Sequence, residues 1–200
     1  IHERLSLMNK KNINIDGRII GPNEPTFIIA EIGQAHDGSL GMAHAYIDAV
    51  AETKVDAIKF QTHFASEEST YDDEFRVQFS KQDETRFDYW KRMEFTEHQW
   101  IELAAHAKEK SLIFLSSAFS TKALDLLIKL GIPAIKIASG EISNQEMLDK
   151  VISSKLPAML STGMSNWGEI EKSVTYFKCN NIPVYVMQCT SEYPTPLNHV

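Results

Sequence analysis

The sequence has few cysteines, no long apolar run and no excess of basic residues. Its two cysteines, Cys179 and Cys189, have no metal-ligand spacing, and we interpret both as free thiols. No apolar stretch approaches the roughly 20 residues of a membrane span, and no apolar signal core is present, so we expect a cytoplasmic protein without a membrane partner. Lysine and arginine number 20 against 27 aspartate and glutamate. The basic residues form no stripe, which argues against a nucleic-acid partner.

Two kinds of functional motif are also missing. No G-x-G-x-x-G follows the first predicted strand, which argues against dinucleotide binding. No H-x-x-x-H or H-E-x-x-H spacing occurs, so we assign no metal ligand among these residues. We expect His44 to be a surface or packing residue on a helix. For His36, in a predicted loop, a site role and loop hydrogen bonding both remain open.

The apolar residues, 43% of the chain, suffice for one sizeable core, and their periodicity predicts alternating strands and helices. A hairpin around Asp16-Gly17 comes first and is expected to close one end of the core. Thr96 with Gln99 and Ser143 with Glu146 have the spacing of capping boxes. Regular alternation means a parallel sheet, either doubly wound or closed as a (β/α)8 TIM barrel, and the near-constant spacing favours the barrel. The six predicted strands are residues 27–32, 55–61, 112–117, 134–138, 157–161 and 184–188.

One connection, residues 62–95, is far longer than the few residues that usually join such elements. It is rich in aromatic residues among many charges. We expect either a folded excursion that covers the site or an oligomer partner, or a tolerated surface insertion.

Lys59 and Lys136 each interrupt an apolar, β-branched strand with a side chain on the inner face. One such lysine alone would be interpreted as reaching solvent from a strand end or as pairing with a structural carboxylate. Two in equivalent places favour an anionic ligand, because a buried ammonium is costly without an anion. Serines at the ends of neighbouring strands suit a phosphate. Glu31 and Glu141 suit hydroxyl groups or a proton on a second substrate, which implies two ligands.

Five motifs, each at a predicted strand end, together resemble the sialic acid synthase (N-acetylneuraminate synthase) family over about residues 12–198. They are Ala30-Glu31-Ile32-Gly33 with His36 and Gly38, Lys59-Phe60-Gln61, Lys136-Ile137-Ala138-Ser139-Gly140-Glu141, Ser161-Thr162-Gly163-Met164, and Cys189-Thr190-Ser191-Glu192-Tyr193-Pro194.

The resemblance implies a carbon-carbon bond-forming transferase on a TIM barrel. Its substrates would be phosphoenolpyruvate and an N-acylated mannosamine-like sugar, and its products a nonulosonic (sialic or legionaminic) acid and phosphate. Glu31 would be the acid/base carboxylate. The phosphoenolpyruvate set would be Lys59, Ser117, Lys136, Ser139, Ser161 and Ser191, and the sugar contacts Gln61, Glu141 and Tyr193.

Family chains usually carry Asn where Ala35 stands, Thr where Ser117 stands and often Asn where Ser191 stands. They also continue through two further βα units and a small antifreeze-like domain. We therefore expect residues 1–200 to form a single, incomplete barrel domain of about six βα units without the antifreeze-like domain. The resemblance further implies a divalent metal (Mn2+ or Mg2+), with ligands expected beyond residue 200, and a homodimer at full length.

Two other functions remain open from the residues alone. An inward barrel lysine is also the nucleophile of a Schiff-base class I aldolase, and a second lysine would lower its pKa. A catalytically silent sugar- or phosphate-binding module is the other alternative.

Overall fold

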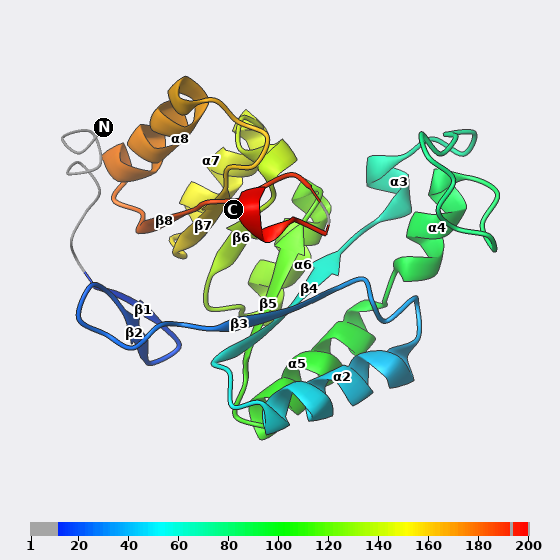
Figure 1. Ribbon diagram of the computed structural model, residues 1–200, viewed down its shortest axis with the longest axis horizontal. Helices are drawn as coiled ribbons and strands as arrows, with labels where there is room; N and C mark the ends of the chain where they lie inside the picture. Colours follow the sequence, from blue (N-terminus) through cyan, green and yellow to red (C-terminus); the bar gives the residue numbers. More distant parts are fainter. Residues whose placement is uncertain (1–11, 193, 200) are drawn as a thin grey trace.

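The computed structural model describes residues 12–192 and 194–199, which form a curled parallel sheet with helices packed against it (Figure 1). The strand order is β3-β4-β5-β6-β7-β8, so each strand lies beside its predecessor in the chain. A doubly wound sheet would reverse its order at a switch point. The barrel-type prediction is therefore confirmed. The strands are β3 (Ile29–Gly33), β4 (Ala57–Thr62), β5 (Ile113–Ala118), β6 (Ile135–Ile137), β7 (Ala158–Ser161) and β8 (Val184–Met187).

The helices follow the strands and cover the convex side of the sheet with a large apolar layer. In Figure 1, α2 and α5 lie together near β3 and β4, while α7 and α8 lie toward the other end. Trp100 and Phe60 are the largest side chains that this layer buries completely. The helices and helical turns are α2 (Leu40–Glu52), α3 (Ala65–Glu68), α4 (Arg86–Met93), α5 (Glu97–Glu109), α6 (Thr121–Leu130), η1 (Ser139–Glu141), α7 (Gln145–Ser154), α8 (Trp167–Cys179) and η2 (Leu197–His199).

Helix capping follows one of the two predicted boxes. Thr96 and Gln99 form the expected reciprocal box at the start of α5. The Ser143 prediction is wrong by one residue, because η1 and the following turn occupy the chain up to that point. Asn144 is the N-cap of α7, and its side chain accepts a hydrogen bond from the Met147 backbone N–H at 3.2 Å.

The predicted hairpin is present and closes one end of the concave face. β1 (Ile13–Ile15) and β2 (Arg18–Ile20) pair antiparallel through Asp16 and Gly17, whose φ angles of 50° and 83° suit a tight hairpin turn. Ile15 is fully buried among apolar residues of the strands. Arg18 Nε donates to Asp56 Oδ1 at 2.8 Å and so ties the hairpin to the start of β4.

The long insertion is a folded excursion that contains α3 and α4 and projects from the rest of the molecule in Figure 1. The Arg92 guanidinium holds it in place by binding Asp83 within the insertion and Asp37 in the loop after β3, with shortest distances of 2.6 Å to each. Gly38, with φ of 79°, allows this approach, since a Cβ there would lie 2.3 Å from the Arg92 carbonyl oxygen.

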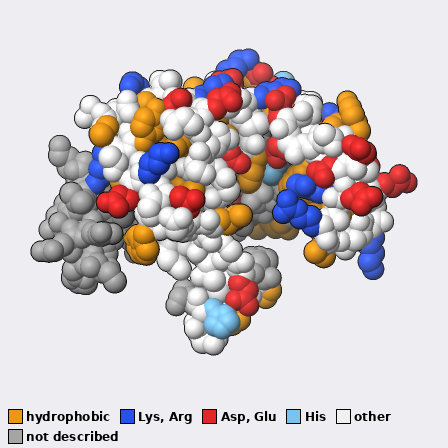
Figure 2. Space-filling view, turned by 90° about the horizontal axis from the view of Figure 1, so that it is seen from above, with side chains coloured by type: hydrophobic (Ala, Val, Ile, Leu, Met, Phe, Trp, Pro, Cys, Tyr) orange, Lys and Arg blue, Asp and Glu red, His pale blue; other side chains and the backbone are white. Residues whose placement is uncertain are grey.

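Within residues 12–192 and 194–199, no helix is both long enough and apolar enough to cross a membrane. Figure 2 shows acidic and basic side chains interspersed on the face that it presents.

Candidate functional site

The concave face of the sheet changes from apolar to polar along the strands. Near their N-terminal ends, inward residues pack around Ile15 of the hairpin; they are Ala57, Leu115, Ala134 and Met159. Closer to the C-terminal ends of the strands, the inward-facing residues are polar. The register places Glu31 beside Lys59, and Ser117 beside both Gln61 and Lys136. The polar layer therefore lies at the C-terminal ends of the strands, where parallel barrels hold their sites.

Lys59 is 5% exposed and has two partners in this layer. Its ammonium donates to Ser117 Oγ at 3.0 Å and forms an ion pair with Glu31 Oε2 at 2.5 Å. The Glu31 side chain is half exposed, so the pair has one buried and one accessible member. A ligand could reach the ammonium from the side of Glu31.

Lys136 is 9% exposed and donates a hydrogen bond to Ser161 Oγ on β7. Burial, together with the neighbouring charge of Lys59, lowers the pKa of Lys136 to about 8, although Cys189 and Glu31 act in the opposite direction. No carboxylate forms a salt bridge with Lys136 among the described residues. Its positive charge is therefore poorly compensated, and an anionic ligand would relieve that cost.

Three strand-end loops meet at Gly163 beside these lysines. The Gly163 backbone N–H donates to Ser139 Oγ at 3.3 Å, and Ser191 Oγ donates to the Gly163 carbonyl at 2.6 Å. A Cβ at Gly163 would lie 2.7 Å from Ser191 Oγ and 3.2 Å from the Cβ of Cys189. The structure thus brings Ser139 and Ser191 to the same end of the sheet as Ser161.

A cavity of about 780 Å3 adjoins the polar layer and holds Gln61 and Glu141, two of the predicted sugar contacts. Four glutamates and one arginine line it, so its charge suits a neutral, hydroxyl-rich molecule better than a phosphate. The insertion supplies part of the wall, which supports the interpretation that it covers the site. The lining residues are Gln61, His63, Glu67, Glu68, Arg86, Trp90, Phe119, Ser120, Thr121, Glu141, Asn144 and Glu146.

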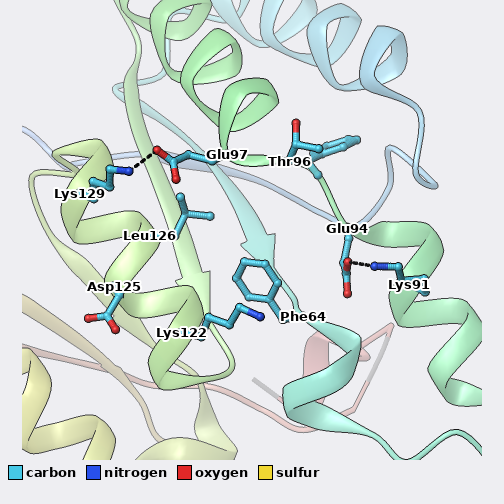
Figure 3. A pocket seen from close by; sticks show the side chains of 10 residues that line it. Phe64, Lys91, Glu94, Thr96, Glu97, Lys122, Asp125, Leu126 and Lys129 are labelled. Carbon is cyan, nitrogen blue, oxygen red and sulfur yellow. Dashed lines mark hydrogen bonds and ion pairs between the residues drawn. The ribbon is translucent and has the colours of Figure 1, made fainter.

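A second groove, of about 600 Å3, lies between α6 and the connection from α4 to α5 (Figure 3). Its positive charges already have partners. Lys129 pairs with Glu97 at 2.5 Å, and Lys91 pairs with Glu94 at 2.7 Å. Lys122 lies 4.6 Å from the centre of the Phe64 ring. This groove therefore lacks a buried, poorly compensated cation such as Lys136.

The histidines make local contacts. His36 is buried against Phe95, its Nδ1 accepts from the Gly38 N–H at 3.1 Å, and burial lowers its pKa to about 4. Its Nδ1 thus forms a loop hydrogen bond, while its Nε2 is buried without a hydrogen-bond partner among the described residues. His44 packs between α2 and α5 with its Nδ1 2.8 Å from His106 Nδ1, as a packing residue should. Among residues 12–192 and 194–199, no group of three or more His, Cys, Asp or Glu could hold a metal ion.

Sequence patterns did not assign the cavity wall that contains His63 and Glu68. The only signal was the position of His63 just after β4. It stands two residues after Gln61, so the alternation of a strand would place both side chains on the same side. Tyr193, predicted as a sugar contact, lies outside the described residues. Both cysteines are free thiols, as predicted.

Comparisons with known proteins agree on one family. The model of the NeuB family matches residues 46–200. An uncharacterized protein of Methanocaldococcus jannaschii is 35% identical over 195 residues, which cover 95% of this chain and 53% of that protein. The N,N'-diacetyllegionaminic acid synthase of Campylobacter jejuni is 34% identical over 181 residues, which cover 88% of this chain and 54% of that enzyme.

Solved structures give the same result. The crystal structure of N-acetylneuraminic acid (sialic acid) synthetase from Leptospira borgpetersenii serovar Hardjo-bovis, in complex with citrate, superposes with a TM-score of 0.82 at 31% identity. The match covers 96% of this chain and 64% of that chain. The chain spans about half the length of the curated relatives that it matches. By sequence and by structure, this chain belongs to the NeuB family of sialic acid synthases and their relatives.

Proposed function

We propose that this protein joins phosphoenolpyruvate to the open-chain aldehyde of an N-acylated mannosamine-like sugar, giving a nonulosonic acid and phosphate. The observation that carries the proposal is the pair of buried lysines, Lys59 and Lys136, each hydrogen-bonded to a serine at a strand end. Ammonium and hydroxyl donors from neighbouring strands match the oxygens of a phosphate and a carboxylate. Relatives named as legionaminic, pseudaminic and N-acetylneuraminate-9-phosphate synthases support the reaction class.

In the proposed reaction, C3 of phosphoenolpyruvate forms a bond to the aldehyde carbon, and the aldehyde oxygen takes up a proton to become a hydroxyl. Water adds to C2 and releases one proton, which leaves a carbon that bears both a hydroxyl and the phosphate. The C2–O bond to phosphate then breaks, phosphate leaves with the electron pair of that bond, and the hydroxyl loses its proton to become the C2 carbonyl. Lys59, Lys136 and their serines would hold the phosphate and carboxylate groups. Glu31, next to Lys59 and half exposed, would move the proton.

The sugar would occupy the adjoining cavity, where Gln61 and Glu141 lie. Its neutral hydroxyl groups suit a wall that offers both hydrogen-bond donors and acceptors.

The divalent metal that the resemblance implies does not fit the described residues. The described residues hold no group of three or more His, Cys, Asp or Glu that could bind a metal ion, and His63 already uses both ring nitrogens in contacts within the protein. No step of the proposal therefore depends on a metal, and ligands beyond residue 200 stay a prediction. We also propose a homodimer at full length, which the mass in solution tests.

The deciding experiment is a turnover assay of the full-length protein. Phosphoenolpyruvate is supplied with N-acetylmannosamine or with its diacetamido-trideoxy counterpart, and both phosphate release and sugar-acid formation are measured. Release of one phosphate per sugar acid would support the proposal. Release of phosphate without a carbon-carbon bond would overturn it.

One observation favours a second candidate, a Schiff-base aldolase. The lowered pKa of Lys136, about 8, leaves more of its amine neutral and nucleophilic near neutral pH than an ordinary lysine has. Borohydride treatment in the presence of pyruvate distinguishes the two reactions, because only an imine is reduced to a stable adduct. A covalent adduct at Lys136 or Lys59 would replace the condensation proposal. Phosphoenolpyruvate binding without turnover in the full-length protein would instead indicate a binding module.

A further inference from the structure

His63 follows β4 and lies between two aromatic rings in the wall of the sugar cavity. The Trp90 ring stacks against the imidazole with a centroid distance of 4.2 Å and an interplanar angle of 14°, and the Phe119 ring stacks against it at 4.2 Å and 18°. The residue is 3% exposed. Because two near-parallel rings hold the imidazole, only its edge is free to form hydrogen bonds. The directions of both ring nitrogens are therefore fixed.

Glu68 of α3 contacts one of the two ring nitrogens of His63, Nδ1. Its Oε2 lies 2.7 Å from His63 Nδ1, while its Oε1 accepts from the Phe64 backbone N–H at 2.9 Å. The Glu68 side chain is only 10% exposed. An ionised carboxylate can only accept hydrogen bonds, so Nδ1 must carry a hydrogen. The other nitrogen, Nε2, can then act as either a hydrogen-bond donor or an acceptor.

His63 Nε2 lies 3.3 Å from Gln61 Oε1. A carbonyl oxygen only accepts, so Nε2 donates in this contact. A ring nitrogen without a hydrogen would instead accept from the Gln61 amide nitrogen, with the amide turned by half a rotation. The ring therefore determines whether Gln61 offers a donor or an acceptor on its other side.

In the observed arrangement the Gln61 amide nitrogen faces away from His63. It lies 3.6 Å from the place where a Cβ of Gly33 would stand, and Glu31 Oε1 lies 3.5 Å from the same place. The donor end of Gln61 is thus on the side of the Glu31 carboxylate. Gln61, His63 and Glu68 all line the same cavity.

We propose that His63 is a positioning residue: clamped by Trp90 and Phe119 and tied to Glu68, it holds the Gln61 amide so that its NH2 group binds an oxygen acceptor of the second substrate. The acceptor is a hydroxyl or acyl-carbonyl oxygen of the sugar. This inference rests on the proposed function, because it assigns a role within the sugar cavity. It also gives the insertion a function, since Glu68 and Trp90 both belong to it.

The test is His63→Phe in the full-length protein, assayed with both substrates. Phenylalanine keeps a flat ring between Trp90 and Phe119 but removes both hydrogen bonds. Loss of one well-aimed hydrogen bond corresponds to about a 10-fold rise in KM for the sugar, whereas KM for phosphoenolpyruvate should stay within about twofold. His44→Phe makes the same chemical change on the outer helices and should leave both constants unaltered.

A double mutant separates positioning from general damage. If His63 acts through Gln61, the variant carrying His63→Phe with Gln61→Ala should be no worse toward the sugar than Gln61→Ala alone. Losses that multiply would overturn the inference, as would an unchanged sugar KM in His63→Phe. If the wild-type protein makes sugar acid and His63→Phe behaves like it, only this inference fails. If the wild-type protein neither binds nor converts an N-acylated sugar, the proposed function fails with it.

Discussion

The Glu31 carboxylate lies 2.5 Å from the Lys59 ammonium, across the first two strands of the parallel sheet. Glu31 and Lys59 are direct neighbours in the strand register, and a shift in that register follows at once, between Glu31 and Gly33. The pair means that an incoming phosphate or carboxylate must share the ammonium with Glu31 or displace it. Binding of the anion and the position of the proposed acid/base group are therefore linked.

Glu31→Gln should separate these two effects. The substitution removes a negative charge that competes for Lys59, so phosphoenolpyruvate should bind at least as tightly as to the wild-type protein. Turnover should fall by about 10²- to 10⁴-fold, the usual contribution of a positioned acid/base group. Calorimetry and steady-state assays measure the two quantities, with Glu171→Gln on α8 as a control. Weaker binding in Glu31→Gln would show that the carboxylate serves the anion site in some other way.

Lys59→Met and Lys136→Met should each weaken phosphoenolpyruvate binding. A charge-assisted hydrogen bond contributes about 1.5 to 3 kcal/mol, so each substitution should cost roughly 10- to 100-fold in affinity. Methionine keeps the length and much of the volume of the side chain, which limits damage to the packing. Lys129→Met, in the groove of Figure 3, removes a lysine already paired with Glu97 and should change nothing. An unaltered dissociation constant in either test variant would make that lysine structural.

The binding of phosphoenolpyruvate should also depend on pH through Lys136. Its pKa is lowered to about 8, so the ammonium is present below that pH and is lost as the pH rises through it. Affinity should therefore fall above pH 8. A bound anion favours the ammonium, so binding near pH 8 to 9 should take up protons from the buffer. Calorimetry in buffers of different ionisation enthalpy measures that uptake, and Lys136→Met should abolish it; uptake that persists in the variant would assign it to another group.

The inward direction of the strand-end side chains could be predicted because it depends on a simple period of two. Ile58 and Phe60 alternate with Lys59 and Gln61, and the structure buries the first two under helices and turns the others to the concave face. The order of the strands followed equally well from their regular spacing. These features depend on residues close together in the chain, for which pattern carries most of the information.

The contacts between distant segments could not be predicted in this way. The Glu31–Lys59 pair depends on the register of two strands and the irregularity after Glu31. The His63 sandwich depends on the path of the insertion, which places Trp90 beside His63, 27 residues earlier in the chain. Charge and aromatic content suggested that the insertion covers something, but not which side chain it contacts.

Lys136 should lower the stability of the folded protein at neutral pH. Its folded-state pKa of about 8 lies below the usual 10.5, so between these values the unfolded chain binds more protons than the folded one. The free energy of unfolding should therefore rise with pH through this window, while below pH 8 the full cost, about 3 kcal/mol, remains. Lys136→Met removes the charge, and urea unfolding at pH 7 should show a higher midpoint despite the lost anion binding. A lower midpoint would mean that the contact with Ser161 outweighs the cost of burial.

Arg92→Lys should loosen the insertion while leaving the anion site intact. The guanidinium binds both oxygens of Asp83 and also Asp37, a forked geometry that a single ammonium cannot reproduce. The Asp83 side chain is only 4% exposed, so losing its partner should cost about 1.5 to 3 kcal/mol locally. Limited proteolysis should cut the insertion faster. KM for the sugar should rise while phosphoenolpyruvate affinity stays constant, because the insertion supplies part of the sugar-cavity wall, whereas the partners of Lys59 and Lys136 lie outside it. Lys91→Ala, at the neighbouring position of α4, breaks the ion pair with Glu94. Because the Lys91 side chain is 64% exposed, this change should alter neither the proteolysis rate nor KM for the sugar. If both substrates bound more weakly in Arg92→Lys, the insertion would be supporting the whole strand-end site rather than the sugar side alone.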